Sequence, residues 1–364
     1  MSRQATRALR FSLIPWLLLP AVAAITLLGP ILQPSKAADT LPSRYTDEEF
    51  WRLINDLSEP NGFYQYENFV SNEISYQTVI PELKKNTKPG GVYMGVGPEQ
   101  NFTYIAAIEP KVAFILDIRR QNLVELLMYK ALFEMSPDRA DFVSRLFSRK
   151  RPAGLGPASS AADIFLAFDT VAADKQLYDE TLQSIRDRLK QHGFKPVGDD
   201  DQKIEYVFNV FFRGGPRMNY AFASNSPNSA VPSYHWLMLM TDSRGENWAF
   251  LASESRYKFV RDIQQKNLIV PLVADFAGPK TLKALGQYLK EHGATVTAFY
   301  ISNVEDYIES KWAAYVSNIR ALPQDDTSLF IRWLSGPVTH LSWMKDTPDR
   351  WPAMFTNPLG GALQ

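Results

Sequence analysis

The chain contains no cysteine, which excludes disulfides, thiolate metal sites, a lipid-anchored cysteine and a cysteine nucleophile. It has only four histidines and lacks the G-x-S-x-G elbow, the P-loop and the H-E-x-x-H zinc motif. Lys plus Arg and Asp plus Glu are equal at 39 each, so no net field favours nucleic acid. We therefore expect no metal and no nucleic-acid partner, and a function must be argued from local features.

The first 38 residues contain the pattern of an export signal or membrane anchor. Arg3, Arg7 and Arg10 form a basic start, residues 11–32 are uncharged and largely apolar, and residues 35–37 are small enough for peptidase cleavage. The apolar run exceeds the usual signal core and approaches the length that spans a bilayer. The arginines favour the inside, so we expect an extracytoplasmic domain, periplasmic or membrane-anchored.

Residues 90–122 form the unit around which the fold is built. Residues 92–94 are a short apolar run, and a turn containing Gly95 and Gly97 then leads to a proline suited to the start of a helix. A second apolar run, residues 112–116, ends on Asp117. Strand, glycine turn, helix, strand and acid are the layout of a nucleoside site in a doubly wound α/β domain.

A second unit of the same design follows later in the chain. Residues 268–274 are a buried-type run ending in Asp275, Gly278 precedes a helical pattern, and residues 295–302 form another strand before Asn303. Parallel strands end at the same edge of a sheet, where ligands bind. Asp275 and Asn303 are therefore expected on the rim that also holds Asp117.

The periodic patterns predict an α/β fold with a doubly wound, mostly parallel sheet and a helical insertion. Two apolar runs, residues 236–240 and 248–252, are predicted to pair as a hairpin, and either of them is a candidate for the third strand. The expected organisation is an export or anchor segment at 1–38, an α/β domain at 39–334 with the insertion at about 136–235, and an irregular tail at 335–364.

Several shorter segments carry alternative interpretations. Glu73 falls near the start of a helical pattern over residues 72–85, where a capping role is favoured over a pocket role. The basic residues at 145–151 are either a solvated face or an anion anchor. The composition of residues 152–160 predicts a mobile or lid-like loop. His235 is the one histidine considered as an acid or base.

The glycine turn supplies close backbone approach and helix N–H groups, and the distal acid accepts ribose hydroxyls. NAD, FAD and S-adenosylmethionine all use this combination. Gln100 stands where a dinucleotide fingerprint needs its third glycine, which argues against a pyrophosphate. The candidate ligand-binding residues are Gly95, Gly97, Gln100, Asn101, Asp117 and Asp275.

These strings resemble a family of uncharacterised bacterial proteins with a class I methyltransferase-like fold. The resemblance rests on residues 91–105, 117–122, 129–134, 139–142, 146–149 and 267–279, and it covers about residues 71–322. It implies that Gly95 and Gly97 line a nucleoside pocket and that Asp117 holds the ribose. Tyr93 occupies the position where methyltransferases usually carry an acid, which leaves the amino-acid end of S-adenosylmethionine without its usual support.

Three hypotheses follow from the sequence. The first is an exported or tethered methyltransferase-like domain that binds a nucleoside-containing or similarly polar small ligand, with S-adenosylmethionine as the cofactor that the resemblance implies. The second is a non-catalytic envelope binding protein that uses the pocket, the basic residues at 145–151 and the aromatic segment at 63–69. The third, an NAD-linked oxidoreductase, is disfavoured by Gln100.

Overall fold

The computed structural model describes residues 39–223, 231–334 and 338–350. The chain divides into two compact units, Met1–Ala37 and Ala38–Gln364, and the described residues belong to the second. The predicted export segment lies outside the described residues. Within the described ranges, no helix has both the length and the apolar character needed to cross a membrane.

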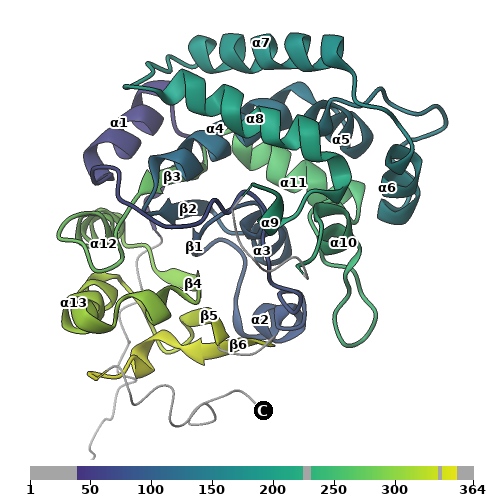
Figure 1. Cartoon of the computed structure of the whole chain (residues 1–364). Helices are drawn as coiled ribbons and strands as arrows, with labels where there is room; N and C mark the ends of the chain where they lie inside the picture. The colour runs from purple at the N-terminus through teal and green to yellow at the C-terminus, as the bar shows by residue number, and fades with distance from the viewer. Residues whose placement is uncertain (1–38, 224–230, 335–337, 351–364) are drawn as a thin grey trace, which may run out of the picture. The chain divides into compact units, whose positions relative to one another are not determined.

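A six-stranded mixed sheet forms the centre of the domain, in the order β3-β2-β1-β4-β5-β6 (Figure 1). All neighbouring strands pair in parallel except β5 and β6, which are antiparallel. The chain runs outward from β1 to β2 and β3, then returns to β4 on the other side of β1. This reversal between β1 and β4 is the position where open α/β sheets bind ligands. The strands are β1 (Val92–Val96), β2 (Val112–Asp117), β3 (Ile269–Val273), β4 (Val296–Ser302), β5 (Leu329–Leu334) and β6 (Val338–Trp343).

The apolar runs of the sequence are the buried strands of this sheet. Every residue of β2 and β3 is buried, as expected for parallel strands that are covered on both faces. Pro271 lies within β3 opposite Ile115 of β2. Strand β3 lies at the edge of the sheet and pairs only with β2. The N–H that proline lacks is therefore not needed for pairing with a strand on the other side.

Two layers of helices cover the sheet (Figure 1). One contains α1, α12 and α13, which contact one another in that order, and the other contains α2, α3, α11 and α4. Their bounds are α1 (Asp47–Leu57), α2 (Ile80–Asn86), α3 (Gln100–Ile108), α4 (Arg120–Met135), α11 (Glu254–Gln265), α12 (Thr281–Glu291) and α13 (Trp312–Ala321).

The connection between β2 and β3 contains most of the remaining helices. It begins with α4 and ends with α11, and between them α7 and α8 pack on each other and on α4. Residues 136–235, expected as a helical insertion, lie within this connection. Its further members are α5 (Arg139–Phe147), α6 (Ala161–Asp169), α7 (Lys175–Gln191), α8 (Asp200–Gly214), η1 (Gly215–Arg217), α9 (Tyr220–Ala223) and α10 (Tyr234–Leu239).

The predicted hairpin at 236–240 and 248–252 is wrong. The first run lies in α10, where the Ser233 side chain accepts a hydrogen bond from the Trp236 N–H and so caps the helix. The second run is irregular at residues 248–249 and forms a turn at 250–252, with only its three central residues fully buried. Short apolar runs do not distinguish a strand from a buried helical turn by periodicity. The third strand beside β2 is instead β3.

The C-terminal part of the domain also differs from the prediction. The tail expected to be irregular from residue 335 contains β6, which pairs with β5 from Leu329↔Trp343 to Leu334↔Val338. The helical pattern over residues 72–85 becomes turns followed by α2. Between β4 and β5 the chain forms η2 (Val304–Tyr307), η3 (Glu309–Lys311) and α13.

Candidate functional site

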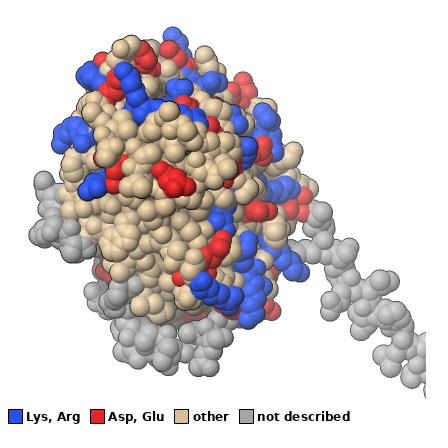
Figure 2. All heavy atoms as spheres, turned by 90° about the vertical axis from the view of Figure 1, so that its right-hand side faces the viewer, with Lys and Arg blue, Asp and Glu red and all other residues tan. Residues whose placement is uncertain are grey.

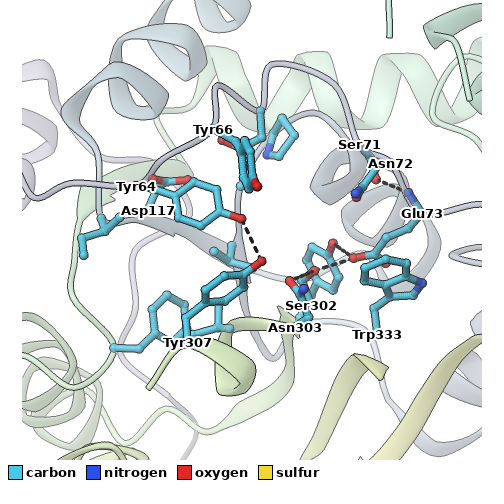
Figure 3. A pocket seen from close by; sticks show the side chains of 18 of the residues that line it. Tyr64, Tyr66, Ser71, Asn72, Glu73, Asp117, Ser302, Asn303, Tyr307 and Trp333 are labelled. Carbon is cyan, nitrogen blue, oxygen red and sulfur yellow. Dashed lines mark hydrogen bonds between the residues drawn. The ribbon is translucent and has the colours of Figure 1, made fainter. Parts of the chain in front are cut away.

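A cavity of about 780 Å³ lies at the carboxyl ends of the central strands (Figure 3). Its wall includes Val96 from the end of β1, Asp117 from β2, Asp275 just after β3, and Ser302 from β4. The segment from Phe63 to Glu73 completes the wall from the other side. The volume falls within the range of small-molecule sites, and the position is the topological switch point.

The glycine turn is shaped by an internal brace. Gly97 has φ +78° and lines the cavity, so a residue with a side chain is strained there. The Asn101 amide donates to the carbonyls of Val96, Gly97 and Pro98 at 2.9, 3.2 and 2.8 Å. A Cβ at Gly95 would collide with the Asn101 side chain. Gly95 therefore makes room for the brace, and neither it nor Asn101 faces the cavity.

Tyr93 has a structural role behind the same turn. It is fully buried, and its hydroxyl donates to Asn101 Oδ1 at 2.8 Å. The position where a methyltransferase usually carries an acid is therefore part of the brace.

Gln100 also lies behind the cavity wall, where it holds residues that do face the cavity. Its carbonyl oxygen accepts from the Ser71 hydroxyl, and its amide donates to Glu73 Oε2 at 3.1 Å and to the Tyr104 hydroxyl at 3.2 Å. Ser71 and Glu73 both line the cavity. Gln100 thus positions the wall and does not reach the cavity itself.

Glu73 is a cavity residue and not a helix cap. Its carboxylate accepts from the Tyr300 hydroxyl at 2.6 Å and the Ser302 hydroxyl at 2.5 Å, and α2 begins only at Ile80. Burial raises the pKa of Glu73, and hydrogen bonds from Ser302, Tyr300 and Gln100 oppose this shift. The sequence favours a cap over this pocket role, because the helical pattern over residues 72–85 places Glu73 near a helix start, whereas α2 begins only at Ile80.

Asp117 faces the cavity from the end of β2. Its Oδ1 accepts from the Arg119 backbone N–H at 2.8 Å, and the Arg119 Nε lies 3.4 Å away. The same guanidinium donates to the Tyr66 carbonyl at 3.0 Å and to the Asn68 side chain. Arg119 therefore ties the acid of β2 to the aromatic segment across the cavity.

Asp275 lies on the cavity rim, but the glycine turn beside it is closed. Asp275 pairs with Lys311 at 3.0 Å. The Glu59 carboxylate accepts from the backbone N–H groups of Asp275 and Lys280, both at 2.7 Å, and of Thr281 at 3.2 Å. The start of α12 is thus occupied by a carboxylate of the chain itself. The second glycine turn resembles the first in sequence, but its helix start has no room for an anion from a ligand.

Tyrosines gather at the mouth of the cavity (Figure 3). The Tyr64 hydroxyl donates to that of Tyr307 at 3.2 Å, and their ring centroids lie 5.4 Å apart. Tyr66 contacts both Tyr64 and Tyr220 through its ring. Phe63 is 84% exposed although it also lines the cavity. A planar or apolar ring entering here would meet an aromatic surface.

The cavity wall thus includes three of the six candidate residues, Gly97, Asp117 and Asp275, while Gly95, Gln100 and Asn101 lie behind it. Asn303, expected on the same rim, also lines the cavity. His235 does not: its Nδ1 lies 3.3 Å from Asp169, and its ring stacks on Phe165.

The basic residues at 145–151 are engaged within the protein. Arg145 pairs with Asp141, Lys150 with Asp174 and Arg151 with Asp138, while the buried Arg149 donates to the carbonyls of Phe147 and Phe212. Arg145, Lys150 and Arg151 are thus paired with acids of the protein, whereas Arg149 is buried and does not belong to a solvated face. None of these residues lines the cavity at the sheet edge.

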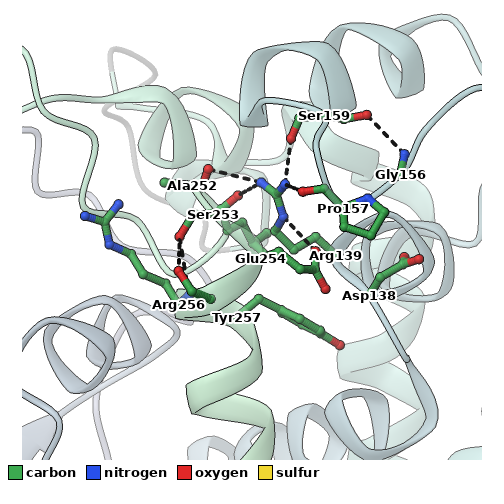
Figure 4. Close-up of polar contacts among 12 residues, drawn as sticks. Asp138, Arg139, Gly156, Pro157, Ser159, Ala252, Ser253, Glu254, Arg256 and Tyr257 are labelled. Atoms are coloured by element: carbon green, nitrogen blue, oxygen red, sulfur yellow. Dashed lines mark hydrogen bonds and ion pairs between the residues drawn. The ribbon is translucent and has the colours of Figure 1, made fainter.

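The loop at 152–160 is fixed by a buried arginine (Figure 4). Arg139 donates to the carbonyls of Pro157 and Ser159 at 3.1 and 2.6 Å, and to that of Ala252 at 3.1 Å. Its Nε also pairs with Glu254 at 3.1 Å. Arg139 thereby joins this loop to the start of α11, away from the cavity. The loop expected to be lid-like is a structural connection.

The sheet order and the cavity define an α/β protein with a Rossmann-like mixed sheet and a ligand-sized cavity at its switch point. The model of a domain of unknown function, DUF7790, matches residues 68–356, and the chain belongs to this family. The match begins at the aromatic segment and includes every strand. No curated protein matches the chain.

Proposed function

We propose that this domain binds a nucleoside-containing or similarly polar small ligand in the cavity between Gly97, Asp117 and Asp275. The observation that carries the proposal is that Gly97 and Asp117 line one cavity at the switch point of the sheet. An acid at the end of the second strand is suited to ribose hydroxyls, and the turn at Gly97 allows close backbone approach.

A methyltransferase-like function is the enzymatic form of this proposal. Asp117 would hold the ribose of S-adenosylmethionine, and the rings of Tyr64 and Tyr307 offer a surface on which the base could stack. The bound cofactor would supply a transferable methyl group. Where the acid expected at the Tyr93 position is absent, Glu73 lines the cavity from another segment of the chain.

A second candidate is a non-catalytic envelope binding protein with the same cavity. The basic start and the apolar run at 11–32 favour this alternative, because they direct the domain outside the cytoplasm, where S-adenosylmethionine is scarce. The N-terminal segment would then also make the membrane a partner of the uncleaved chain.

Thermal unfolding of the full chain in detergent tests the nucleoside proposal. The ligands are S-adenosylmethionine, its demethylated product, NAD and nucleotides. A ligand present at a hundred times its dissociation constant stabilises the folded state by about 2.7 kcal/mol. We expect a rise in the midpoint for at least one nucleoside with the native protein. Asp117→Asn should remove this rise, measured against the variant's own ligand-free midpoint.

The matched control is Asp262→Asn, because Asp262 pairs with Lys266 outside the cavity wall. This variant should keep the full ligand-induced rise. If no nucleoside shifts the midpoint of the native protein, the nucleoside proposal is rejected and the envelope binding protein is favoured.

A further inference from the structure

The carboxylate of Glu73 is buried in the cavity wall among neutral hydrogen-bond donors. The side chain is 1% exposed and accepts from the Tyr300 and Ser302 hydroxyls and from the Gln100 amide. A carboxylate has about four acceptor positions, and these three bonds leave about one. None of the three donors carries a charge.

The other acids of the cavity wall have basic partners. Asp117 lies 3.4 Å from the Arg119 guanidinium, and Asp275 lies 3.0 Å from the Lys311 ammonium. No lysine, arginine or histidine of the described chain forms an ion pair with Glu73. Glu73 is therefore the acid of this wall whose charge the described protein leaves unbalanced.

An unbalanced buried carboxylate is costly, because burial removes water without providing an opposite charge. The nearby tyrosines show the same electrostatic environment. The pKa values of Tyr93 and Tyr104 are raised chiefly by burial, and further by the negative charge of Glu73. A positive group that enters the cavity would remove this cost.

We propose that the Glu73 end of the cavity binds a positively charged alkylammonium group of the ligand. The ammonium donates to the remaining acceptor position of Glu73. Trp333 lies beside Glu73 in the cavity wall (Figure 3), and its ring offers a face that attracts a cation. The ligand class is an amine that also carries polar groups for the Asp117 side of the cavity.

This inference rests on the proposed function only in placing the ligand in the same cavity. Figure 3 shows Glu73 and Asp117 on different sides of that cavity. The two ends can therefore be tested with different pairs of compounds. One pair contains a nucleoside, and the other contains none.

The experiment compares two matched pairs of compounds on the full chain in detergent, by thermal midpoint and by ligand-observed NMR. The first pair is 5′-amino-5′-deoxyadenosine and adenosine, and the second is 4-amino-1-butanol and 1,4-butanediol. In at least one pair we expect the amine to bind at least about tenfold more tightly than the alcohol, since a hydrogen bond to a charged group contributes about 1.5–3 kcal/mol.

Glu73→Gln should reduce this preference to less than about threefold, because it keeps the size of the side chain and removes its charge. Glu180→Gln, at an exposed glutamate of α7, should keep the preference. The absence of an amine preference on the native protein overturns the proposal even where Glu73→Gln does not fold.

The outcomes separate the two proposals. Adenosine binding without any advantage for the amine supports the nucleoside site and overturns the ammonium site. An amine preference in the aminobutanol pair, when neither adenosine compound binds, supports the ammonium site and rejects the nucleoside. Failure of both amines to bind, or a preference that survives Glu73→Gln, overturns the ammonium site.

Discussion

At the scale of single residues, acids behind the glycine turn are buried without enough hydrogen bonds or opposite charges to balance the loss of water. Glu99 is fully buried at the N-cap position of α3, and burial raises its pKa to about 8. Neither carboxyl oxygen of Glu125 has a hydrogen-bond partner among the described residues. Burial, and then the charge of Glu99, raise the pKa of Glu125 well above its ordinary value, and the Arg119 charge opposes this shift. A neutral side chain suits the Glu125 position better than a carboxylate at neutral pH.

Glu125→Gln should therefore stabilise the protein at high pH and leave it unchanged at low pH. A carboxyl whose pKa is raised in the folded state binds its proton more tightly there, so stability falls as the pH rises above the ordinary value of 4.5. Each unit by which the pKa of Glu125 differs between the folded and unfolded states changes the free energy of unfolding by about 1.4 kcal/mol at high pH. In a domain this large, that change shifts the thermal midpoint by roughly 2 °C or more.

The measurement is the thermal midpoint of both proteins at pH 4 and at pH 8. Glu291→Gln, at an exposed residue of α12, is the control and should show no pH-dependent gain. A gain of equal size at both pH values would contradict the assignment of the effect to the Glu125 charge.

The cavity residues at the ends of predicted strands could be predicted from the sequence. Asp117 and Asp275 follow buried runs, and strand ends share one edge, so their place could be predicted. The roles of Gln100 and Asn101 could not be, because the direction of a side chain at the start of a helix depends on what packs beneath it. Glu73 and Tyr300 meet only in the folded protein, from positions far apart in the chain.

At the scale of elements, the two strand-turn-helix units differ in how each helix start is satisfied. The turn before α3 faces the cavity at Gly97, whereas the start of α12 accommodates the Glu59 carboxylate. A Cβ at Gly278 would come within 2.5 Å of both Glu59 carboxyl oxygens. Because three backbone N–H groups hold that carboxylate, it cannot move away without losing hydrogen bonds.

Gly278→Ala should therefore lower the free energy of unfolding by about 1–3 kcal/mol, the usual cost of overpacking. Urea unfolding monitored by tryptophan fluorescence measures this change. Gly156→Ala is the matched control, since a Cβ there meets nothing within 4 Å and the backbone φ is not positive. This substitution should be neutral or slightly stabilising.

A double variant identifies the cause. In a Glu59→Ala background, Gly278→Ala should cost less than it does alone, because the carboxylate that the new Cβ would meet is gone. Additive effects of the two substitutions would show that Glu59 is not the obstructing group.

The elements most accurately predicted are those with clear buried runs, such as β2, which the sequence predicts over residues 112–116 before Asp117 and which spans Val112–Asp117. The failures share a physical cause. The run at 236–240 is short and apolar, and β6 has no apolar alternation strong enough to reveal an edge strand. Helix α10 begins after the Ser233 cap, and β6 pairs with β5, the strand directly before it, so neither structure is visible in the apolar pattern of the segment itself.

At the scale of the whole molecule, charge gives little direction to binding. On the face shown in Figure 2, acidic and basic side chains are intermixed along the margins, and the centre is largely uncharged. This agrees with the sequence, in which Lys plus Arg and Asp plus Glu each total 39. We therefore expect local chemistry in the cavity, and the location of the chain in the cell, to decide which ligands it meets.

The proposed location is tested by fractionation of a bacterial host that expresses the full chain. We expect the protein in the membrane or periplasmic fraction and sensitive to protease added from outside. Leu18→Arg together with Ile25→Arg interrupts the apolar run and should retain the chain inside. A native chain that is soluble in the cytosol would contradict export and strengthen the methyltransferase-like proposal.

The pairing of β2 with β3 also affects how the chain reaches its native state. The crossover between these strands is roughly ten times as long as the one between β1 and β2, so its closure costs about 2 kcal/mol more in chain entropy. The contact order of this strand pair is high, and such pairings form late in folding. The helices from α4 to α11 would then assemble before the sheet receives its outer strand. The edge of β2 would stay open to aggregation during that interval.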